Sequence, residues 1–255
     1  MTITIKTEAD IKLLREGGKI LAKILDELEK EVVAGNSTID VDDRAMELME
    51  EYDVEPMILG YHPSFASRPY PAAVCVSIND EVVHGIPNED VVEFIEGDLV
   101  SIDAVIGYQG MVLDSARTVG VGELSKEAQG LLDISHKALS AAIDAAKAGS
   151  HVVEIGRAIV KVVPKKYGII EAFCGHGVGY ELHEEPQIPN FITKDKGPKL
   201  EPGMVIAIEP MLTTGSKEVV VLEDGYTAVT ADGSLAAHVE HTVLITKDGP
   251  EILTM

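Results

Sequence analysis

The sequence has few cysteines, few basic residues and no long apolar run. Cys75 and Cys174 form no Cys-x-x-Cys pair, so neither a disulfide scaffold nor a cysteine zinc site is indicated. Lysines and arginines number 21 against 43 acidic residues, and the net charge of −22 argues against an electrostatic grip on nucleic acid or anionic lipid. No apolar run approaches the ~20 residues of a membrane span, and residues 1–12 lack the apolar core of a signal peptide. We therefore expect a cytoplasmic protein that binds neither membranes nor nucleic acid directly.

Helical periodicity predicts two pairs of helices. Apolar residues recur at helical spacing in the segments 8–32, 41–52, 124–147 and 152–167. In the second segment we expect Met46, Leu48 and Met49 to face inward. The local text Asp43-Arg44-Ala45 resembles Gly156-Arg157-Ala158, which suggests two αα-then-β halves related by duplication. We expect one domain over residues 1–255, with halves of roughly 1–122 and 123–255 sharing one core.

The stretch from Leu99 to Thr118 predicts a β-hairpin, because two apolar runs flank Gly107-Tyr108-Gln109-Gly110. If the loop centres on Tyr108 and Gln109, Asp103 lies directly opposite Asp114. Like charges at roughly 5 Å destabilise a sheet unless something such as a bound cation offsets their repulsion. A register different by one residue would place the two side chains on opposite faces, and both could also face water. The hairpin alone leaves these alternatives open.

Three histidines follow breaks in the predicted strands. His84 ends a short strand before Gly85-Ile86-Pro87, and His176 and His183 lie seven residues apart around three glycines. Neutral imidazole is the commonest metal ligand, and glycines let the backbone pack close to a site. Each histidine alone is more often an ordinary loop or core residue.

Two glutamates occupy otherwise apolar strands. In the predicted strand Met204–Leu212, Glu209 is the last residue on the inward face before Pro210. In the last strand region, Glu240 shares a face with His238. Each carboxylate alone would more often lie at an edge or in solvent. Several acids on glycine-edged strands are harder to explain in this way.

Four acids and one histidine define the expected chemistry. The acids are Asp103, Asp114, Glu209 and Glu240. Two divalent cations would balance their charge, with neutral His176 as a fifth ligand. An oxygen-dominated set with one imidazole suits Mn, Fe, Co, Zn or Mg. Two such ions can share a water, lower its pKa and stabilise a tetrahedral intermediate, which is the chemistry of hydrolysis.

Over essentially its whole length the sequence resembles the type I methionine aminopeptidases of peptidase family M24. The segments that carry the resemblance are SINDEVVHGIP, IDAVIGYQGMVLDSART, CGHGVGYELHEEPQIPNF, PGMVIAIEPML and VEHTVLIT. The resemblance implies an α/β (α+β) protein of pita-bread fold, in which two pseudo-symmetric αα-β halves surround a central antiparallel curved sheet. This agrees with the internal duplication inferred above.

The resemblance also implies roles for individual residues. The positions that match the family's ligands of two divalent ions are Asp103, Asp114, His176, Glu209 and Glu240. Asp114 and Glu240 match the ligands that bridge the ions, and Glu209 matches the residue that moves protons to and from the attacking water. His84 matches the histidine that contacts the scissile amide, and His183 matches the one that steadies the developing oxyanion.

The sequence departs from the family pattern around the substrate pocket. The run GYHPSFASRPYP is six residues longer than its counterpart in the family, so Tyr61 and Tyr70 match pocket tyrosines only if residues 64–70 hold an insertion. Tyr226 stands where a tryptophan is common. Cys75 either lines the pocket or is a buried structural cysteine.

The implied activity is hydrolytic removal of the initiator methionine from nascent proteins and peptides whose second residue is small, with a metal-activated water attacking the scissile carbonyl. The implied cofactors are two divalent ions, namely Co, Mn, Fe or Zn. The expected partners are peptide and nascent-chain N-termini, with transient ribosome association, and the expected state is a monomer.

Two other functions remain open on the sequence. A proline-specific peptidase of the same fold would usually carry an additional amino-terminal domain. A non-catalytic homologue that binds partners or RNA would need lost ligands or a basic surface, and the sequence has neither.

Overall fold

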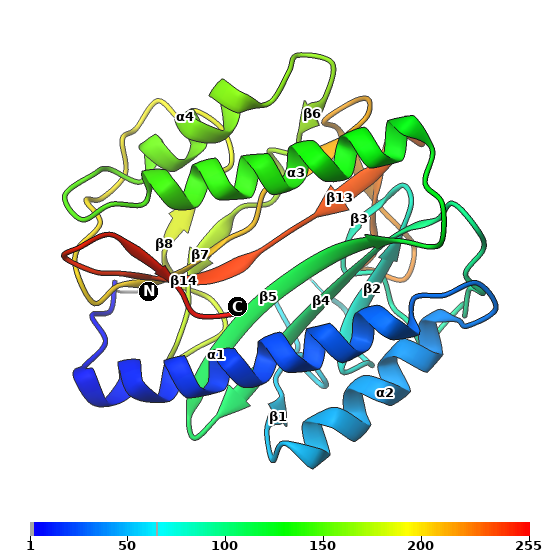
Figure 1. Ribbon diagram of the computed structural model, residues 1–255, viewed down its shortest axis with the longest axis horizontal. Coiled ribbons are helices and arrows are strands. Elements are labelled where there is room, and N and C mark those ends of the chain that lie inside the picture. The colour runs from blue at the N-terminus through cyan, green and yellow to red at the C-terminus, as the bar shows by residue number, and fades with distance from the viewer. Residues whose placement is uncertain (1–2, 65) are drawn as a thin grey trace.

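Two helix pairs flank the strands on opposite sides of the molecule (Figure 1). The computed structural model describes residues 3–64 and 66–255. Its helices are α1 (Glu8–Leu28), the short 3-10 helix η1 (Glu29–Glu31), α2 (Thr38–Glu51), α3 (Lys126–Ala145) and α4 (Val153–Val162). In this view α1 and α2 lie below the strands, and α3 and α4 lie above them. Across the described ranges, no helix combines the length and apolar character needed to cross a membrane.

The strands pair in antiparallel fashion throughout the four sheets of the described chain. The first strands in the chain are β1 (Glu55–Pro56), β2 (Val74–Ile78), β3 (Glu81–Val83), β4 (Leu99–Tyr108) and β5 (Met111–Gly120). The later ones are β6 (Gly168–Ile169), β7 (Gly175–Gly177), β8 (Glu184–Ile188), β9 (Val205–Ile208), β10 (Met211–Thr213), β11 (Val219–Val221), β12 (Ala228–Thr230), β13 (Ala236–His238), β14 (His241–Ile245) and β15 (Pro250–Ile252). The sheet orders are β1-β4-β2 with β5 beside β4, β13-β10-β6, β11-β12-β3, and β15-β14-β9-β7-β8. Helices and antiparallel sheets together confirm the expected α+β class.

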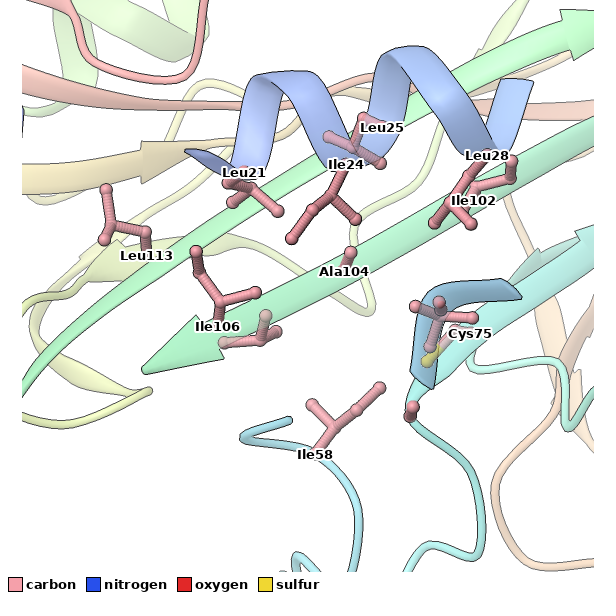
Figure 2. Packing of buried hydrophobic residues seen from close by; sticks show 14 of the residues in the cluster. Leu21, Ile24, Leu25, Leu28, Ile58, Cys75, Ile102, Ala104, Ile106 and Leu113 are labelled. Atoms are coloured by element: carbon pink, nitrogen blue, oxygen red, sulfur yellow. The ribbon is translucent and has the colours of Figure 1, made fainter. Parts of the chain in front are cut away.

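Helix α1 starts at a capping box and packs its apolar stripe on the β4–β5 hairpin. Thr7 and Asp10 satisfy each other's backbone N–H groups at the N-terminus of the helix. Figure 2 shows Leu21, Ile24 and Leu28 of α1 beside the apolar side chains of β4. All three are fully buried, and burial of such side chains stabilises a fold by about 1.5–3 kcal/mol each. The hairpin is therefore held in place by this helix.

Strand β4 presents different chemistry on its two faces. Ile102, Ala104 and Ile106 belong to the apolar core under α1, as Figure 2 shows. The alternate residues Asp103 and Val105 point to the other face and line a cavity. Anchoring one face of β4 on α1 thus sets the position of the acidic group on the other face.

The register of the hairpin differs from the predicted one. Asp103 pairs with Ala116, and Asp114 pairs with Val105, so the two aspartates are diagonal neighbours rather than directly opposite. The turn consists of Gln109 and Gly110, with φ of 50° and 82°, and not of Tyr108 and Gln109 as expected. Tight hairpin turns of this kind need positive φ at both central residues, which favours a glycine there. Because the partner shifts by two residues, both aspartates keep a common face.

The second and fourth helices also differ in detail from the sequence prediction. Helix α2 starts three residues earlier than expected, because Ser37 forms a capping box with Asp40. Met46 is 42% exposed, so its predicted inward orientation is wrong, whereas Leu48 and Met49 are buried. Helix α4 ends at Val162, two residues before the proline that cannot continue it.

Gly18 provides a test of the close packing of α1. A Cβ at this position would overlap the backbone carbonyl of Leu253, and backbone cannot move aside as a side chain can. We expect Gly18→Ala to lower the free energy of unfolding by about 1–3 kcal/mol in urea denaturation, despite the better helix propensity of alanine.

Gly130→Ala in α3 is the matched control. Its Cβ would meet only the hydroxyl of Tyr167, at the far end of a side chain. This variant should be neutral or gain up to about 1 kcal/mol. Equal effects of the two substitutions would contradict the proposed contact between α1 and the C-terminal segment.

Candidate metal centre

One cavity of about 280 Å³ contains every residue that the sequence singled out for the site. The cavity is lined by Tyr61, Tyr70, Cys75, His84, Asp103, Asp114, His176, His183, Glu209, Tyr226 and Glu240, among others. These residues come from β2, β4, β5 and β7 and from the connections β1–β2, β3–β4, β7–β8, β9–β10, β11–β12 and β13–β14, so both halves of the chain contribute. The fold thus brings together residues up to 179 positions apart in sequence.

Hydrogen bonds across the two halves place Glu240 beside Asp114. The hydroxyl of Thr242 donates to the carbonyl of Asp114 at 2.7 Å and accepts from its N–H at 3.1 Å. The hydroxyl of Ser115 donates to the carbonyl of Glu240 at 2.8 Å. In addition, the N–H of Glu240 donates to the carbonyl of Ala116. Strand β5 and the start of β14 therefore act as one rigid support for two carboxylates.

His176 turns one ring nitrogen toward the acids. Its Nδ1 lies 3.0 Å from the carbonyl of Gly177, which can only accept, so Nδ1 carries the proton in the neutral ring. Nε2 is then an acceptor, and it lies 3.6 Å from Oδ2 of Asp114 and 3.4 Å from Oε1 of Glu209. An imidazole whose other nitrogen donates to a backbone carbonyl is a typical arrangement for a metal ligand.

Burial raises the pKa of all four acids. The pKa of Asp103 rises to about 6, and those of Asp114, Glu209 and Glu240 rise well above their usual range, first because of desolvation. Repulsion from neighbouring carboxylates adds to the effect for Asp114, Glu209 and Glu240. Protein groups alone thus do not stabilise the ionised forms, which need a positive partner.

The residues fit a divalent metal centre. Donor atoms of Asp114, His176 and Glu240 all lie within 4.8 Å of one another. Oδ1 of Asp103, Oδ1 of Asp114 and Oε1 of Glu240 are buried and have no hydrogen-bond partner among the described residues. Buried polar oxygens without a partner cost free energy, and cations would satisfy them. The set of carboxylate oxygens with an imidazole suits ions such as Mn²⁺, Fe²⁺, Co²⁺ or Zn²⁺.

His84 and His183 lie beside the acids in the same cavity. Burial lowers the pKa of His84 to about 4 and also lowers that of His183, so both rings are neutral near pH 7. The ring of His183 lies 4.5 Å from that of His176, centre to centre, and its Nδ1 lies 3.1 Å from the hydroxyl of Tyr61. Both imidazoles can therefore exchange hydrogen bonds with a molecule in the cavity.

The long loop keeps its two tyrosines together. The N–H of Tyr70 donates to the carbonyl of Tyr61, and the N–H of Gly60 donates to the carbonyl of Tyr70, each at 2.8 Å. Within the predicted insertion 64–70, Phe65 lies outside the described residues. The hydroxyl of Tyr70 donates to the carbonyl of Gly85 at 2.7 Å, and that of Tyr226 donates to the carbonyl of Arg68. The tyrosine rings of residues 70 and 226 pack edge to face at 5.1 Å.

Cys75 agrees with both interpretations that the sequence left open, a residue that lines the pocket and a buried structural cysteine. It is only 5% exposed and belongs to the apolar core, yet it also lines the cavity. Burial raises the pKa of its thiol well above the usual range. We therefore describe it as an apolar wall residue rather than a reactive thiol.

His238 is a cavity residue that the sequence reasoning did not select. It is 2% exposed, and its Nε2 lies 3.8 Å from Oε2 of Glu209 and 3.6 Å from Oε2 of Glu240. The sequence does contain an indication of this position, because strand alternation places His238 on the same face as Glu240. A lone histidine in an apolar strand is more often structural, and only the convergence of two strands distinguishes the cases.

Comparison with known proteins assigns the chain to a family. The profile of metallopeptidase family M24 matches residues 12–247. A methionine aminopeptidase of Aquifex aeolicus is 47% identical over 259 residues, which cover 100% of this chain and 99% of that protein. The crystal structure of a methionine aminopeptidase from Thermotoga maritima superposes with a TM-score of 0.94 at 42% identity, covering 99% of each chain.

A more distant structure shares the fold alone. The prolidase of Pyrococcus horikoshii gives a TM-score of 0.74 at 24% identity, and the match covers 98% of this chain but 63% of that one. These likenesses confirm the pita-bread fold that the sequence predicted. On the family profile and the full-length relatives, the chain belongs to metallopeptidase family M24.

Proposed function

We propose that this protein is a methionine aminopeptidase, which removes the N-terminal methionine from peptides and nascent chains whose second residue is small. The observation that carries the proposal is the convergence of three buried acids, the half-buried Asp103 and His176 on one partly apolar cavity. Full-length relatives that bear the name methionine aminopeptidase support the same activity.

We propose that two divalent ions, Mn, Co, Fe or Zn, are held by Asp103, Asp114, His176, Glu209 and Glu240. Asp114 and Glu240 are the proposed bridging ligands, in keeping with the hydrogen bonds that lock them side by side. When bound, the ions would lower the pKa of a water and stabilise negative charge on the reacting carbonyl oxygen. The four carboxylates would then be ionised and balanced in charge.

The side chains of the cavity supply proton transfer and hydrogen bonds. Glu209 lies between His176 and His238 in the cavity, and we assign it the transfer of a proton from the attacking water and back. His84 is neutral and is the proposed contact of the scissile amide. We assign the hydroxyl of Tyr61 as the donor to Nδ1 of His183, which leaves an N–H at Nε2 to stabilise the developing oxyanion.

The apolar wall is the proposed binding site of the methionine side chain. It includes Tyr70, Cys75 and Tyr226, together with Ile58 and Leu182. An unbranched thioether fits an irregular apolar pocket and packs well against aromatic rings. Tyr61, at the mouth of the cavity, is 36% exposed and is free to contact the peptide as well as His183.

We propose the remaining properties from the sequence and the family. The chain would act as a single catalytic domain in which halves 1–122 and 123–255 are duplicates, and two helix pairs at corresponding positions support this. It would work as a cytoplasmic monomer that meets nascent chains through transient ribosome association, without binding nucleic acid directly. The net charge of −22 argues for weak, transient contact with RNA-rich surfaces.

The first prediction concerns metal and substrate. After dialysis against a chelator the enzyme should be inactive, and adding Mn²⁺, Co²⁺, Fe²⁺ or Zn²⁺ should restore release of methionine from Met-Ala-Ser, measured by chromatography. Ala-Pro-Ala should stay intact. Cleavage of Ala-Pro-Ala alone would indicate a proline-specific enzyme on the same fold, and cleavage of neither would favour a non-catalytic homologue.

A second prediction concerns the proposed bridging ligand Glu240. Glu240→Gln keeps the size of the side chain and removes its charge, so we expect at least 100-fold lower turnover of Met-Ala-Ser and reduced metal content by elemental analysis. In wild type, Mn²⁺ should raise the melting temperature, because ligands that bind only the folded state stabilise it. This rise should be small or absent in the variant.

Glu251→Gln is the control for that substitution. Glu251 lies in an exposed ion pair with Arg15, outside the cavity, and such pairs contribute about 0–1 kcal/mol. Its turnover, metal content and response to Mn²⁺ should match wild type. Normal metal content together with full activity in Glu240→Gln would contradict the proposed site.

A further inference from the structure

His238 lies deep in the cavity with an unused ring nitrogen. It ends β13 two residues before Glu240 and is 2% exposed, and its Nε2 is buried without a hydrogen-bond partner in residues 3–64 and 66–255. A buried polar atom of this kind costs free energy unless something engages it. The mechanism proposed above gives His238 no task.

Two histidines lie on opposite sides of the Glu209 carboxylate. Nε2 of His176 lies 3.4 Å from Oε1, and Nε2 of His238 lies 3.8 Å from Oε2. Nε2 of His238 is also 3.6 Å from Oε2 of Glu240, whereas Oε1 of Glu240 has no hydrogen-bond partner in the described part of the chain. In both glutamates, therefore, Oε2 faces His238 and the other oxygen is left for another partner.

The two imidazoles present opposite chemistry to the acids. His176 gives its Nδ1–H to the carbonyl of Gly177 and so directs a lone pair at the centre of the cavity. Nε2 of His238 faces the carboxylate oxygens of Glu209 and Glu240, which only accept when ionised. The favourable tautomer of His238 therefore carries its proton on Nε2.

We propose that His238 is a positioning residue of the metal centre: its Nε2–H donates to the Oε2 atoms of Glu209 and Glu240 and so turns their Oε1 atoms toward the metal ions. This inference rests on the proposed function, because it requires a loaded metal centre. The N···O separations of 3.8 and 3.6 Å exceed the usual hydrogen-bond distance of about 2.9 Å, so both hydrogen bonds would form only in the loaded centre, where the glutamates would be ionised.

The consequence is a preorganised pair of ligands. A carboxylate that accepts a hydrogen bond at one oxygen loses its freedom to rotate and offers the other oxygen to the ion. In this way one imidazole would hold two carboxylates, that of the proposed bridging ligand Glu240 and that of the proposed proton carrier Glu209. Removing the donor should therefore weaken metal binding rather than abolish folding, since the side chain lines the cavity.

The test compares donorless and donor-bearing substitutions. His238→Leu has no donor, and His238→Gln carries an amide N–H₂ of similar reach. Mn²⁺ is titrated into each metal-free protein by calorimetry. We expect His238→Leu to bind Mn²⁺ 10–100-fold more weakly than wild type, and His238→Gln to recover most of that loss. His136→Gln, which removes an exposed histidine from α3, should bind Mn²⁺ like wild type.

Thermal unfolding of the metal-free proteins shows whether each variant is folded. If His238→Leu is unfolded, His238→Met serves as the donorless variant, because its flexible side chain adapts to the same space. Wild-type affinity in a folded donorless variant would overturn the positioning role, and so would a glutamine variant as weak as the leucine one, since both results indicate packing alone. Absence of Mn²⁺ binding in wild type would overturn the metal centre itself, and with it the proposed function.

Discussion

The repulsion among four carboxylates that line one cavity is the constraint on which the rest of this structure depends. Asp103, Asp114, Glu209 and Glu240 line one cavity, and burial raises the pKa of each. A protein that needed only stability would replace such a group with apolar residues, since unpaired buried charge is costly. Cations resolve the conflict, because they convert the repulsion into the binding energy of a metal site. The unfavourable free energy of the clustered carboxylates without cations therefore contributes to the affinity and selectivity with which the centre would bind them.

The fold supports this site because the two faces of one strand have different roles, packing in the core and lining the cavity. One face of β4 carries Ile102, Ala104 and Ile106 into the core beneath α1, and the alternate face carries Asp103 into the cavity. Hydrogen bonds then fix the second half to the first, among them the 2.7 Å bond from the hydroxyl of Thr242 to the carbonyl of Asp114. Contributions from both halves explain why a cavity of this chemistry requires the complete set of strands rather than either hairpin alone.

The sequence predicted the class of fold and the membership of the cavity better than its geometry. Strand alternation and glycine breaks place Asp103, Glu209 and Glu240 on inward faces. A register that differs by two residues leaves these faces unchanged, because side-chain direction alternates with a period of two residues. The register itself was wrong by two residues, since the turn is chosen by the positive φ of Gln109 and Gly110, a property of backbone sterics that apolar spacing does not encode. His238 was not selected because its significance arises from β13 meeting Glu209, a contact between segments that no local pattern describes.

Anomalous X-ray diffraction would show most directly whether the converging acids hold two metal ions, as we propose. Crystals grown with Mn²⁺ and measured at the manganese absorption edge locate bound ions independently of any assay. The account predicts two anomalous peaks inside the cavity, each bordered by Asp114 and Glu240. A cavity without anomalous density at saturating Mn²⁺, in crystals that show the same fold, would contradict it.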